Sequence, residues 1–250
     1  MTQEWIEKEA INVEKWEKHP LKGKRAVIFD MDGTLIDSMW MWGEIDRQYL
    51  GRFGIDLPPD LQKEIEGISF RQVADYFKSH FPIEDSVEQM MQDWISMAWD
   101  KYEHEVPLKE GALEFISFCQ KNHIRLGIAT SNSSKLAHLI LKTHGLSDCF
   151  LVVKTSCEVP NGKPDPAIYL LAAKELKVPP ENCLVFEDAI SGILAGKRAG
   201  MEVCAVYDAF TEKADARKRE LADYYINSFY ELLPGNGQGT QENGNGKLCR

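Results

Sequence analysis

The sequence lacks the patterns that mark several whole classes of protein. It contains no run of 18 consecutive apolar residues, so no membrane-spanning helix is expected. Its 29 lysines and arginines are outnumbered by 39 aspartates and glutamates, and the net charge of −10 disfavours nucleic acid as a partner. The first residues are charged and include no apolar stretch of the kind found in signal peptides. We therefore expect a cytoplasmic protein that binds neither membranes nor nucleic acids.

Cysteine is scarce and scattered, because the chain has only six and none belongs to a C-x-x-C pair. This spacing gives little support to a zinc site. A disulfide framework is typical of small exported domains and is not expected in a chain of 250 residues. We expect reduced thiols that serve mostly as small core residues. They are Cys119, Cys149, Cys157, Cys183, Cys204 and Cys249.

The two ends of the chain differ from its centre. Residues 1–24 are predicted to form an amphipathic helical extension, because apolar residues recur at helical spacing between charges. The sequence leaves open whether this helix packs on its own domain or on another chain, and we expect a monomer or a weak dimer. Residues 233–250 are rich in glycine and poor in bulky apolar residues, so they are predicted to be a disordered tail.

An acidic helical cap domain is predicted between residues 38 and 107. Two S-x-x-Q patterns, at Ser69–Gln72 and Ser86–Gln89, match the capping box that opens a helix. The segment holds six basic and fourteen acidic residues, so most of the net charge lies in it. A segment whose composition differs so clearly from the rest of the chain indicates a separate inserted module.

Short apolar runs alternate with helical patterns in the remainder of the chain. This alternation predicts an α/β fold, a doubly wound parallel sheet built from residues 25–37 and 108–232 with the α-helical cap inserted between them. The expected strands are 26–29, 124–130, 150–153, 183–186 and 203–206, and expected helices run over 133–144, over 165–177 with Asp165 as the N-cap, and from about Thr211.

Polar side chains follow four of the predicted strands at the points where the strands end. In doubly wound sheets the sites lie at the carboxyl ends of the strands, so these side chains are expected to meet at one edge. They are Asp30 and Asp32 after the first strand, Thr130, Ser131 and Asn132 after the second, Lys163 beyond the third, and Glu187 and Asp188 after the fourth.

These residue types favour phosphoryl chemistry with a magnesium ion. Converging carboxylates repel one another, and a hard divalent cation with oxygen ligands would neutralise them. No histidine or cysteine cluster competes for a softer metal. A threonine hydroxyl and a lysine ammonium suit phosphoryl oxygens. An aspartate, with a reference pKa of ~3.9, is already ionised at neutral pH and needs no general base to attack phosphorus.

Four segments resemble the ordered motifs of the haloacid dehalogenase (HAD) superfamily. They are Asp30-Met-Asp-Gly-Thr-Leu-Ile-Asp, Thr130-Ser-Asn, Lys163-Pro-Asp-Pro and Phe186-Glu-Asp. The resemblance extends over residues 25–230. The helical insert after the first motif is similar to the cap of the subgroup that contains β-phosphoglucomutase and many small-molecule phosphatases.

The resemblance implies a role for each motif residue. Asp30 would attack phosphorus and become an aspartyl phosphate, while Asp32 would protonate the leaving oxygen and then deprotonate the attacking water. Phosphate would be bound by Thr130, Ser131, Asn132 and Lys163. The cofactor Mg²⁺ would be held by Asp30, the backbone carbonyl of Asp32, Asp188 and, directly or through water, Glu187.

The residues at these positions help to discriminate among the reactions that members of this superfamily catalyse. Asp32 is typically missing in dehalogenases and replaced by alanine in phosphonate-cleaving members, so its presence disfavours both. In the mutase pattern a cap arginine binds a second phosphate, and Arg71 stands in a similar segment. However, Trp42 stands where a cap histidine is expected, and the cap is acidic. Arg71 and Trp42 are the candidate substrate contacts of the cap.

We therefore predict a Mg²⁺-dependent phosphatase that acts on a small phosphorylated metabolite such as a sugar phosphate. A β-phosphoglucomutase-like phosphohexomutase is the first alternative, and a non-catalytic binding or interaction protein is the second. A binding protein derived from this family would be expected to have lost Asp30 or Asp32, and both are present. The cap is expected to open and close about hinges near Asp37-Ser38 and Val106-Pro107.

Overall fold

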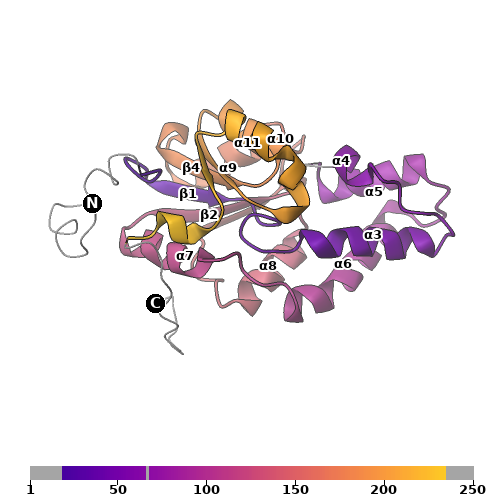
Figure 1. Ribbon diagram of the computed structural model, residues 1–250. Helices are drawn as coiled ribbons and strands as arrows, with labels where there is room; N and C mark the ends of the chain where they lie inside the picture. The colour runs from indigo at the N-terminus through magenta and orange to yellow at the C-terminus, as the bar shows by residue number, and fades with distance from the viewer. Residues whose placement is uncertain (1–18, 66–67, 235–250) are drawn as a thin grey trace.

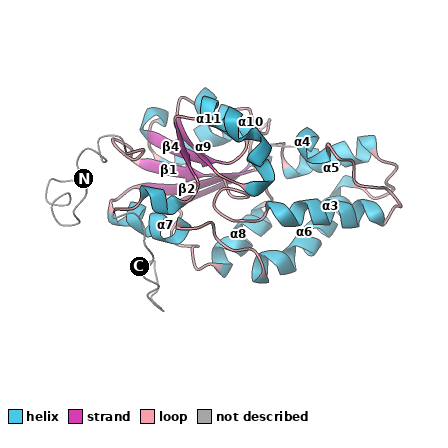
Figure 2. Cartoon of the chain, in the orientation of Figure 1, coloured by secondary structure: helices cyan, strands magenta, loops and turns pink. Residues whose placement is uncertain are grey.

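The centre of the structure is a six-stranded parallel sheet. The structure is a computed structural model that describes residues 19–65 and 68–234 (Figures 1 and 2). The strand order β3-β2-β1-β4-β5-β6 places β1 in the middle, with Val27 paired to Leu126 on one side and to Leu184 on the other. The predicted α/β class with a doubly wound parallel sheet is confirmed. The strands are β1 (Ala26–Phe29), β2 (Arg125–Thr130), β3 (Val152–Thr155), β4 (Cys183–Glu187), β5 (Glu202–Val206) and β6 (Tyr224–Ile226).

Helices cover both faces of this sheet. In Figure 1, α7 and α8 lie on one face, and α9, α10 and α11 lie on the other. Their bounds are α7 (Ala112–Lys121), α8 (Ser134–Thr143), α9 (Ala167–Leu176), α10 (Ile190–Arg198) and α11 (Asp215–Leu221), with 3₁₀ turns at Ser156–Glu158, Pro180–Asn182, Ala209–Ala214 and Phe229–Leu232.

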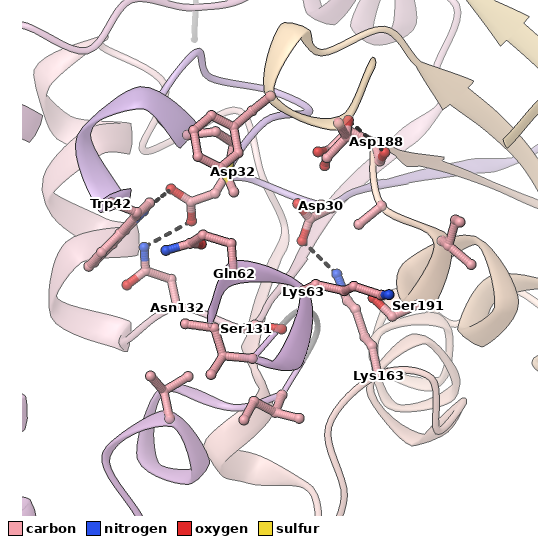
Figure 3. A pocket seen from close by; sticks show the side chains of 18 of the residues that line it. Asp30, Asp32, Trp42, Gln62, Lys63, Ser131, Asn132, Lys163, Asp188 and Ser191 are labelled. Atoms are coloured by element: carbon pink, nitrogen blue, oxygen red, sulfur yellow. Dashed lines mark hydrogen bonds and ion pairs between the residues drawn. The ribbon is translucent and has the colours of Figure 1, made fainter. Parts of the chain in front are cut away.

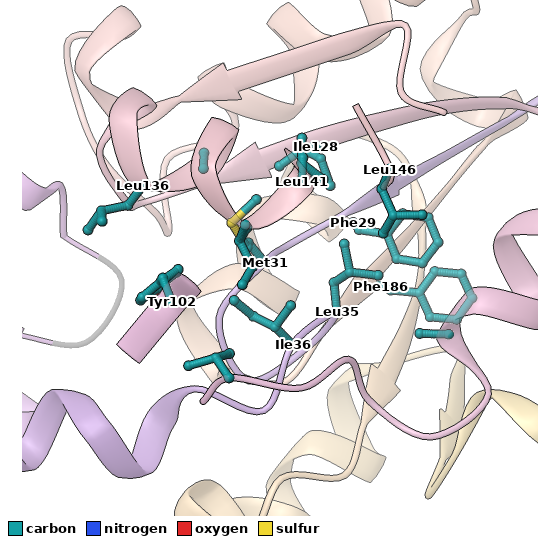
Figure 4. Packing of buried hydrophobic residues seen from close by; sticks show 14 of the residues in the cluster. Phe29, Met31, Leu35, Ile36, Tyr102, Ile128, Leu136, Leu141, Leu146 and Phe186 are labelled. Carbon is teal, nitrogen blue, oxygen red and sulfur yellow. The ribbon is translucent and has the colours of Figure 1, made fainter. Parts of the chain in front are cut away.

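The two layers of helices explain why β1 is apolar throughout. Side chains alternate across a strand, so Val27 and Phe29 pack into one buried cluster while Ala26 and Ile28 pack into the other. Phe29 stacks on Phe186 of the neighbouring strand, with ring centroids 5.2 Å apart. Figure 4 shows this packing, which fixes the end of β1 and therefore the position of the residues that follow it.

Four helices lie together beyond the end of β1 (Figure 1): α3 (Met39–Gly51), α4 (Leu61–Ile65), α5 (Phe70–His80) and α6 (Val87–His104). Ser69 and Gln72 form the complete capping box predicted for α5. Ser86 accepts the N–H of Gln89 at the start of α6, but the side chain of Gln89 bonds Asp93 instead of completing the box. The assignment of residues 38–107 to a separate cap domain and 25–37 with 108–232 to the core stays a prediction.

Two local expectations were wrong, and one strand was not predicted. The helix expected from Asp165 begins at Ala167, because the Asp165 carboxylate accepts the N–H of Ala167 from outside the helix and Pro166 is the N-cap. The helix expected from about Thr211 begins at Asp215, after a 3₁₀ segment whose first turn is capped by Asp208. Strand β6 was not predicted, since it has only three residues and two of them are half-buried tyrosines.

Some predictions fall on parts of the chain that the structure does not describe. Most of the predicted 1–24 helix and of the 233–250 tail lies outside the described residues, as does Cys249. Cys119, Cys157, Cys183 and Cys204 are free thiols, but Cys149 is disulfide-bonded, so the expectation of a reduced thiol is wrong at that position. Within residues 19–65 and 68–234, no helix is both long and apolar enough to cross a membrane.

Candidate active site

The four strand ends meet at one cavity, between the sheet and helices α3 to α6 (Figure 3). Its volume is about 720 Å³. The structure brings to its wall all the sequence-predicted site residues except Arg71: Asp30, Asp32, Trp42, Thr130, Ser131, Asn132, Lys163, Glu187 and Asp188. This convergence follows from parallel strands in register, since each strand delivers its carboxyl end to the same edge of the sheet.

A buried lysine lies between two buried carboxylates on the floor of the cavity. Lys163 Nζ donates to Asp30 Oδ1 at 2.5 Å and to Glu187 Oε1 at 2.6 Å. The hydroxyl of Tyr169 donates to the same Glu187 oxygen at 2.5 Å. Glu187 is thus held by one cation and one phenol, while Asp30 lines the cavity with one oxygen bonded to Lys163.

A third carboxylate completes the acidic cluster. Asp188 accepts a hydrogen bond from the hydroxyl of Thr34 at 2.9 Å. Carboxylate oxygens of Asp30, Glu187 and Asp188 all lie within 4.8 Å of one another. Gly33 allows this approach, because a Cβ atom there would lie 2.5 Å from Asp188 Oδ2 and its φ of +81° favours glycine.

Burial and mutual repulsion perturb the acids of this cluster. Burial raises the pKa of Asp30 to about 7, against the attraction of Lys163, and the charge of Glu187 adds to the rise. Burial raises the pKa of Asp188 well above its usual value, and the charges of Asp30 and Glu187 raise it further. Burial lowers the pKa of Lys163, but the charges of Asp30 and Glu187 outweigh this and keep the ammonium protonated.

The donor set of the cluster fits a hard divalent cation. Three carboxylates share one ammonium, so the ionised cluster carries an excess of negative charge. Among the described residues Asp188 forms no ion pair and has only the neutral Thr34 hydroxyl as a side-chain donor. Oxygen ligands at a buried site of this kind are those that Mg²⁺ prefers.

Asp32 is held apart from the acidic cluster by donors from two directions. Its Oδ1 accepts hydrogen bonds from Ser38 Oγ at 2.6 Å, from Trp42 Nε1 at 3.2 Å and from the hydroxyl of Tyr102. Its Oδ2 accepts from Asn132 Nδ2 at 2.9 Å. Figure 3 shows Asp32 turned toward Trp42 and Asn132 and away from Lys163.

The loop after β2 is shaped by its own side chains. Thr130 Oγ1 accepts the N–H of Asn132 at 3.0 Å, which orders the turn of this loop. The carbonyl of Ser131 accepts the N–H of Phe70 at 3.1 Å and joins this loop to the start of α5. The loop therefore links the sheet edge directly to the helices above it.

The two cap candidates lie in different places. Trp42 lines the cavity, and its indole N–H reaches Asp32. Arg71 lies outside the cavity lining, where its exposed guanidinium pairs with Glu88 at 3.2 Å. Phe70, one residue earlier on α5, is the residue that lines the cavity instead.

Sequence reasoning assigned no role to several residues that contact the site. Tyr102 and Ser38 bond Asp32, Thr34 bonds Asp188, and Tyr169 bonds Glu187. Ser38 and Thr34 lie close to Asp32 in the sequence, and that proximity was the one signal that could have identified them. Tyr102 and Tyr169 lie in helices whose apolar spacing is that of ordinary core residues.

Replacing Gly192 with alanine should disturb Glu187 and its ion pair with Lys163. A Cβ atom at Gly192 in α10 would lie 1.8 Å from Glu187 Oε1, a distance that forces the carboxylate or the helix to move. We expect a loss of about 1–3 kcal/mol in the free energy of unfolding, measured by urea denaturation, because overpacking at a rigid site is accommodated only by strain.

Gly51→Ala is the matched control, because Gly51 is also helical and an added Cβ there would meet nothing within 4 Å. This variant should be as stable as the wild type or more stable by up to about 1 kcal/mol. Equal stabilities of the two variants would show that Glu187 does not need the space above Gly192.

Comparison with known proteins identifies the family. A family model of haloacid dehalogenase-like hydrolases matches residues 27–206. The phosphorylated carbohydrates phosphatase of Thermotoga maritima is 34% identical over 177 residues, which cover 71% of this chain and 82% of the relative. Hexitol phosphatase B of Escherichia coli is 28% identical over 209 residues, 83% of this chain and 93% of the relative.

A solved structure has a similar fold. The crystal structure of β-phosphoglucomutase from Clostridium difficile matches with a TM-score of 0.71 and 24% identity, and covers 84% of this chain and 93% of that one.

The chain therefore belongs to the haloacid dehalogenase-like hydrolases. With phosphatases among its relatives, it is a phosphoric monoester hydrolase of this family.

Proposed function

We propose that this enzyme is a Mg²⁺-dependent phosphatase that hydrolyses a small phosphorylated metabolite, such as a sugar phosphate, through an aspartyl phosphate on Asp30. The observation that carries the proposal is the buried group of Asp30, Lys163, Glu187 and Asp188 on the floor of a cavity of about 720 Å³. Two relatives, a phosphatase of phosphorylated carbohydrates and a hexitol phosphatase, support the same substrate class.

The metal would be held by the carboxylates of Asp30 and Asp188 and by the backbone carbonyl of Asp32, with Glu187 as a further ligand, directly or through water. When bound, Mg²⁺ would supply charge neutralisation between the attacking carboxylate and the phosphoryl oxygens. Lys163 would contribute to the same charge neutralisation, because its ammonium already contacts Asp30 and carries three donors.

The chemical steps are assigned to the two aspartates of the first motif. A free oxygen of Asp30 attacks phosphorus, and the bond from phosphorus to the leaving oxygen breaks. Asp32, in its protonated form, gives its proton to that oxygen and then takes one from the water that hydrolyses the aspartyl phosphate. Asn132, Trp42 and Tyr102 would orient the Asp32 carboxyl group for both transfers, since each already bonds it.

Phosphoryl oxygens would be bound by the loop after β2 and by Lys163. The Thr130 oxygen accepts the N–H of Asn132, and its hydroxyl hydrogen would donate to a phosphoryl oxygen. Ser131 and Asn132 line the same part of the cavity and would add donors as the phosphate enters. Preorganised donors of this kind stabilise the charge of the transition state more than that of the substrate.

The position of Arg71 favours a phosphatase over a mutase. A mutase must bind the second phosphate of a bisphosphate, and the cap arginine considered for that task pairs with Glu88 outside the cavity. Trp42 can serve as a substrate contact through its ring, but it offers no positive charge. A cytoplasmic location and a monomeric or weakly dimeric state remain predictions.

Hydrolysis should require a divalent metal and release free phosphate. We expect steady release of inorganic phosphate from hexose 6-phosphates in the presence of Mg²⁺, loss of that activity in EDTA, and its recovery when Mg²⁺ is restored. Mg²⁺ should also raise the thermal midpoint of unfolding, because a ligand that binds only the folded state stabilises it. The rise in the thermal midpoint on addition of Mg²⁺ tests metal binding independently of activity.

The same assay distinguishes the alternatives. β-Glucose 1-phosphate incubated with Mg²⁺ and a bisphosphate primer should yield glucose and phosphate. Efficient conversion to the 6-phosphate without free phosphate would contradict the phosphatase assignment. Binding of phosphate esters with no turnover of any ester, with or without metal, would instead support the non-catalytic alternative.

A further inference from the structure

Three helices of the cap side bring polar groups into a largely apolar part of the cavity wall, in which Asp60 and Lys63 also lie. Asp46 of α3, Gln62 of α4 and Trp94 of α6 all line the cavity. Around them the same wall is formed by Met39, Trp42, Ile65, Ile68, Phe70 and Val73. Polar groups set into an apolar pocket wall usually fix the orientation of a ligand.

Asp46 is a buried carboxyl group with a single side-chain partner. It is 5% exposed, and its Oδ2 accepts a hydrogen bond from Gln62 Nε2 at 2.5 Å. Among the described residues no cation pairs with it, and burial raises its pKa to about 7. A carboxyl group in such a place is costly unless it gains a further hydrogen bond.

Trp94 supplies a donor without a partner. The side chain is 2% exposed, and its indole Nε1 has no hydrogen-bond partner in the described part of the chain. Most buried donors in folded proteins are satisfied, because an unsatisfied one destabilises the fold. An orphan donor in a residue that lines a cavity therefore points to a ligand group that would accept from it.

The packing of the aromatic rings places the carboxyl group and the indole on the same wall. Asp46 lies four residues after Trp42 and three before Tyr49, so all three share one face of α3. The ring of Trp42 is 6.1 Å from that of Phe70, and the ring of Tyr49 is 5.5 Å from that of Trp94. Phe70 and Trp94 are in turn 5.7 Å apart, and both line the cavity, as Asp46 does.

We propose that Asp46, Gln62 and Trp94 form a subsite for hydroxyl groups of the alcohol part of the substrate, which is a neutral polyhydroxyl compound carrying one phosphate. This inference rests on the proposed function and specifies its substrate class. A hydroxyl group both donates and accepts, so one or two neighbouring hydroxyls could donate to Asp46 and accept from the Trp94 indole. The aromatic rings around them suit the apolar face of a sugar or polyol.

The same subsite should reject a second acidic group. A further phosphate or carboxylate at this wall would meet the carboxylate of Asp46 in a buried place, where like charges repel strongly. The subsite therefore selects monophosphates of polyols and sugars over the corresponding bisphosphates.

The test compares two phosphate esters that differ in hydroxyl groups. The quantity measured is the ratio of kcat/KM for a hexitol 6-phosphate to kcat/KM for phenyl phosphate, which has no hydroxyl group on its leaving part. We expect Asp46→Asn and Trp94→Phe each to lower this ratio about 10-fold or more, because a buried polar group that loses its partner discriminates strongly. Asp46→Asn should also lower the ratio of kcat/KM for the hexitol monophosphate to kcat/KM for a hexose 1,6-bisphosphate.

Tyr49→Phe is the matched control. Tyr49 lies on α3 and packs on Trp94, but its hydroxyl bonds Asp85 and it does not line the cavity. This variant should leave the ratio unchanged.

An unchanged ratio in Asp46→Asn, or an equal fall for both esters, would overturn the subsite. Tighter binding of the bisphosphate than of the monophosphate by the wild type would overturn it as well. If the wild type hydrolysed neither ester, the proposed function would fail, and calorimetric titration with the hexitol phosphate would then decide the subsite. Binding about 10-fold weaker in Asp46→Asn would support it, and equal binding would exclude it.

Discussion

Asp30→Asn is expected to reduce kcat for a sugar phosphate by at least ~10⁴-fold, since removal of a covalent nucleophile leaves only binding and positioning to act on the substrate. The amide has the shape of the carboxylate but is a far weaker nucleophile. It also removes one of the three acids that repel one another on the cavity floor. The fold should therefore persist, with a circular dichroism spectrum like that of the wild type.

Asp75→Asn is the matched control, because Asp75 is an exposed aspartate on α5 that lies outside the cavity lining. It should keep full activity. Rapid acid quenching during turnover should trap labelled phosphate on the wild-type chain and on the control, and none on Asp30→Asn. Mg²⁺-dependent hydrolysis by Asp30→Asn at a rate well above the uncatalysed one would contradict the assignment of Asp30 as the nucleophile.

Lys163→Met is expected to have the largest effect on stability. Lys163 is 4% exposed and contacts two buried carboxylates, Asp30 and Glu187, at 2.5 Å and 2.6 Å. Removing one partner of a buried ion pair leaves uncompensated charge, which typically costs about 3–5 kcal/mol. Urea unfolding at neutral pH without metal should show a loss of this size, and phosphatase activity should fall with it.

Lys154→Met is the matched control, because Lys154 also bridges two carboxylates, Glu158 at 3.0 Å and Glu175 at 2.8 Å. Both of these glutamates are more than 40% exposed, so solvent screens them when the lysine is lost. We expect a loss below about 1 kcal/mol. A similar small loss in Lys163→Met would mean that Asp30 and Glu187 take up protons instead of remaining charged.

The strand ends could be predicted because burial on both faces leaves a clear pattern. Ala26–Phe29 must be apolar at every position to pack between two layers of helices, so the first acid after it, Asp30, marks the edge of the sheet. The same holds for the apolar residues 183–186 of β4 and for Glu187, the first acid after them. Strand β6 lacks this signal, because it pairs only with β5 at the edge of the sheet and buries only Ile226 fully.

The cap side of the site could not be predicted in the same way. Tyr102 lies 70 residues from Asp32, and its spacing on α6 is that of a core residue, so only tertiary contact reveals its bond. The segment that resembles the mutase pattern pointed to Arg71, but the residue that lines the cavity is its neighbour Phe70. Neighbouring residues on a helix point about 100° apart, so Phe70 enters the cavity while Arg71 points to solvent.

The two segments that connect the sheet to helices α3 to α6 are tied to each other. The N–H of Asp37 donates to the carbonyl of Pro107 at 3.0 Å, and Ile36 and Leu108 form an antiparallel bridge beside it. A lid attached through two independent tethers could tilt and slide in several directions. Here the two connections form a single short ribbon, so we expect any opening of helices α3 to α6 to be a swing about one axis. Such a swing would carry Ser38 and Trp42, which follow the ribbon in the chain, away from Asp32 together.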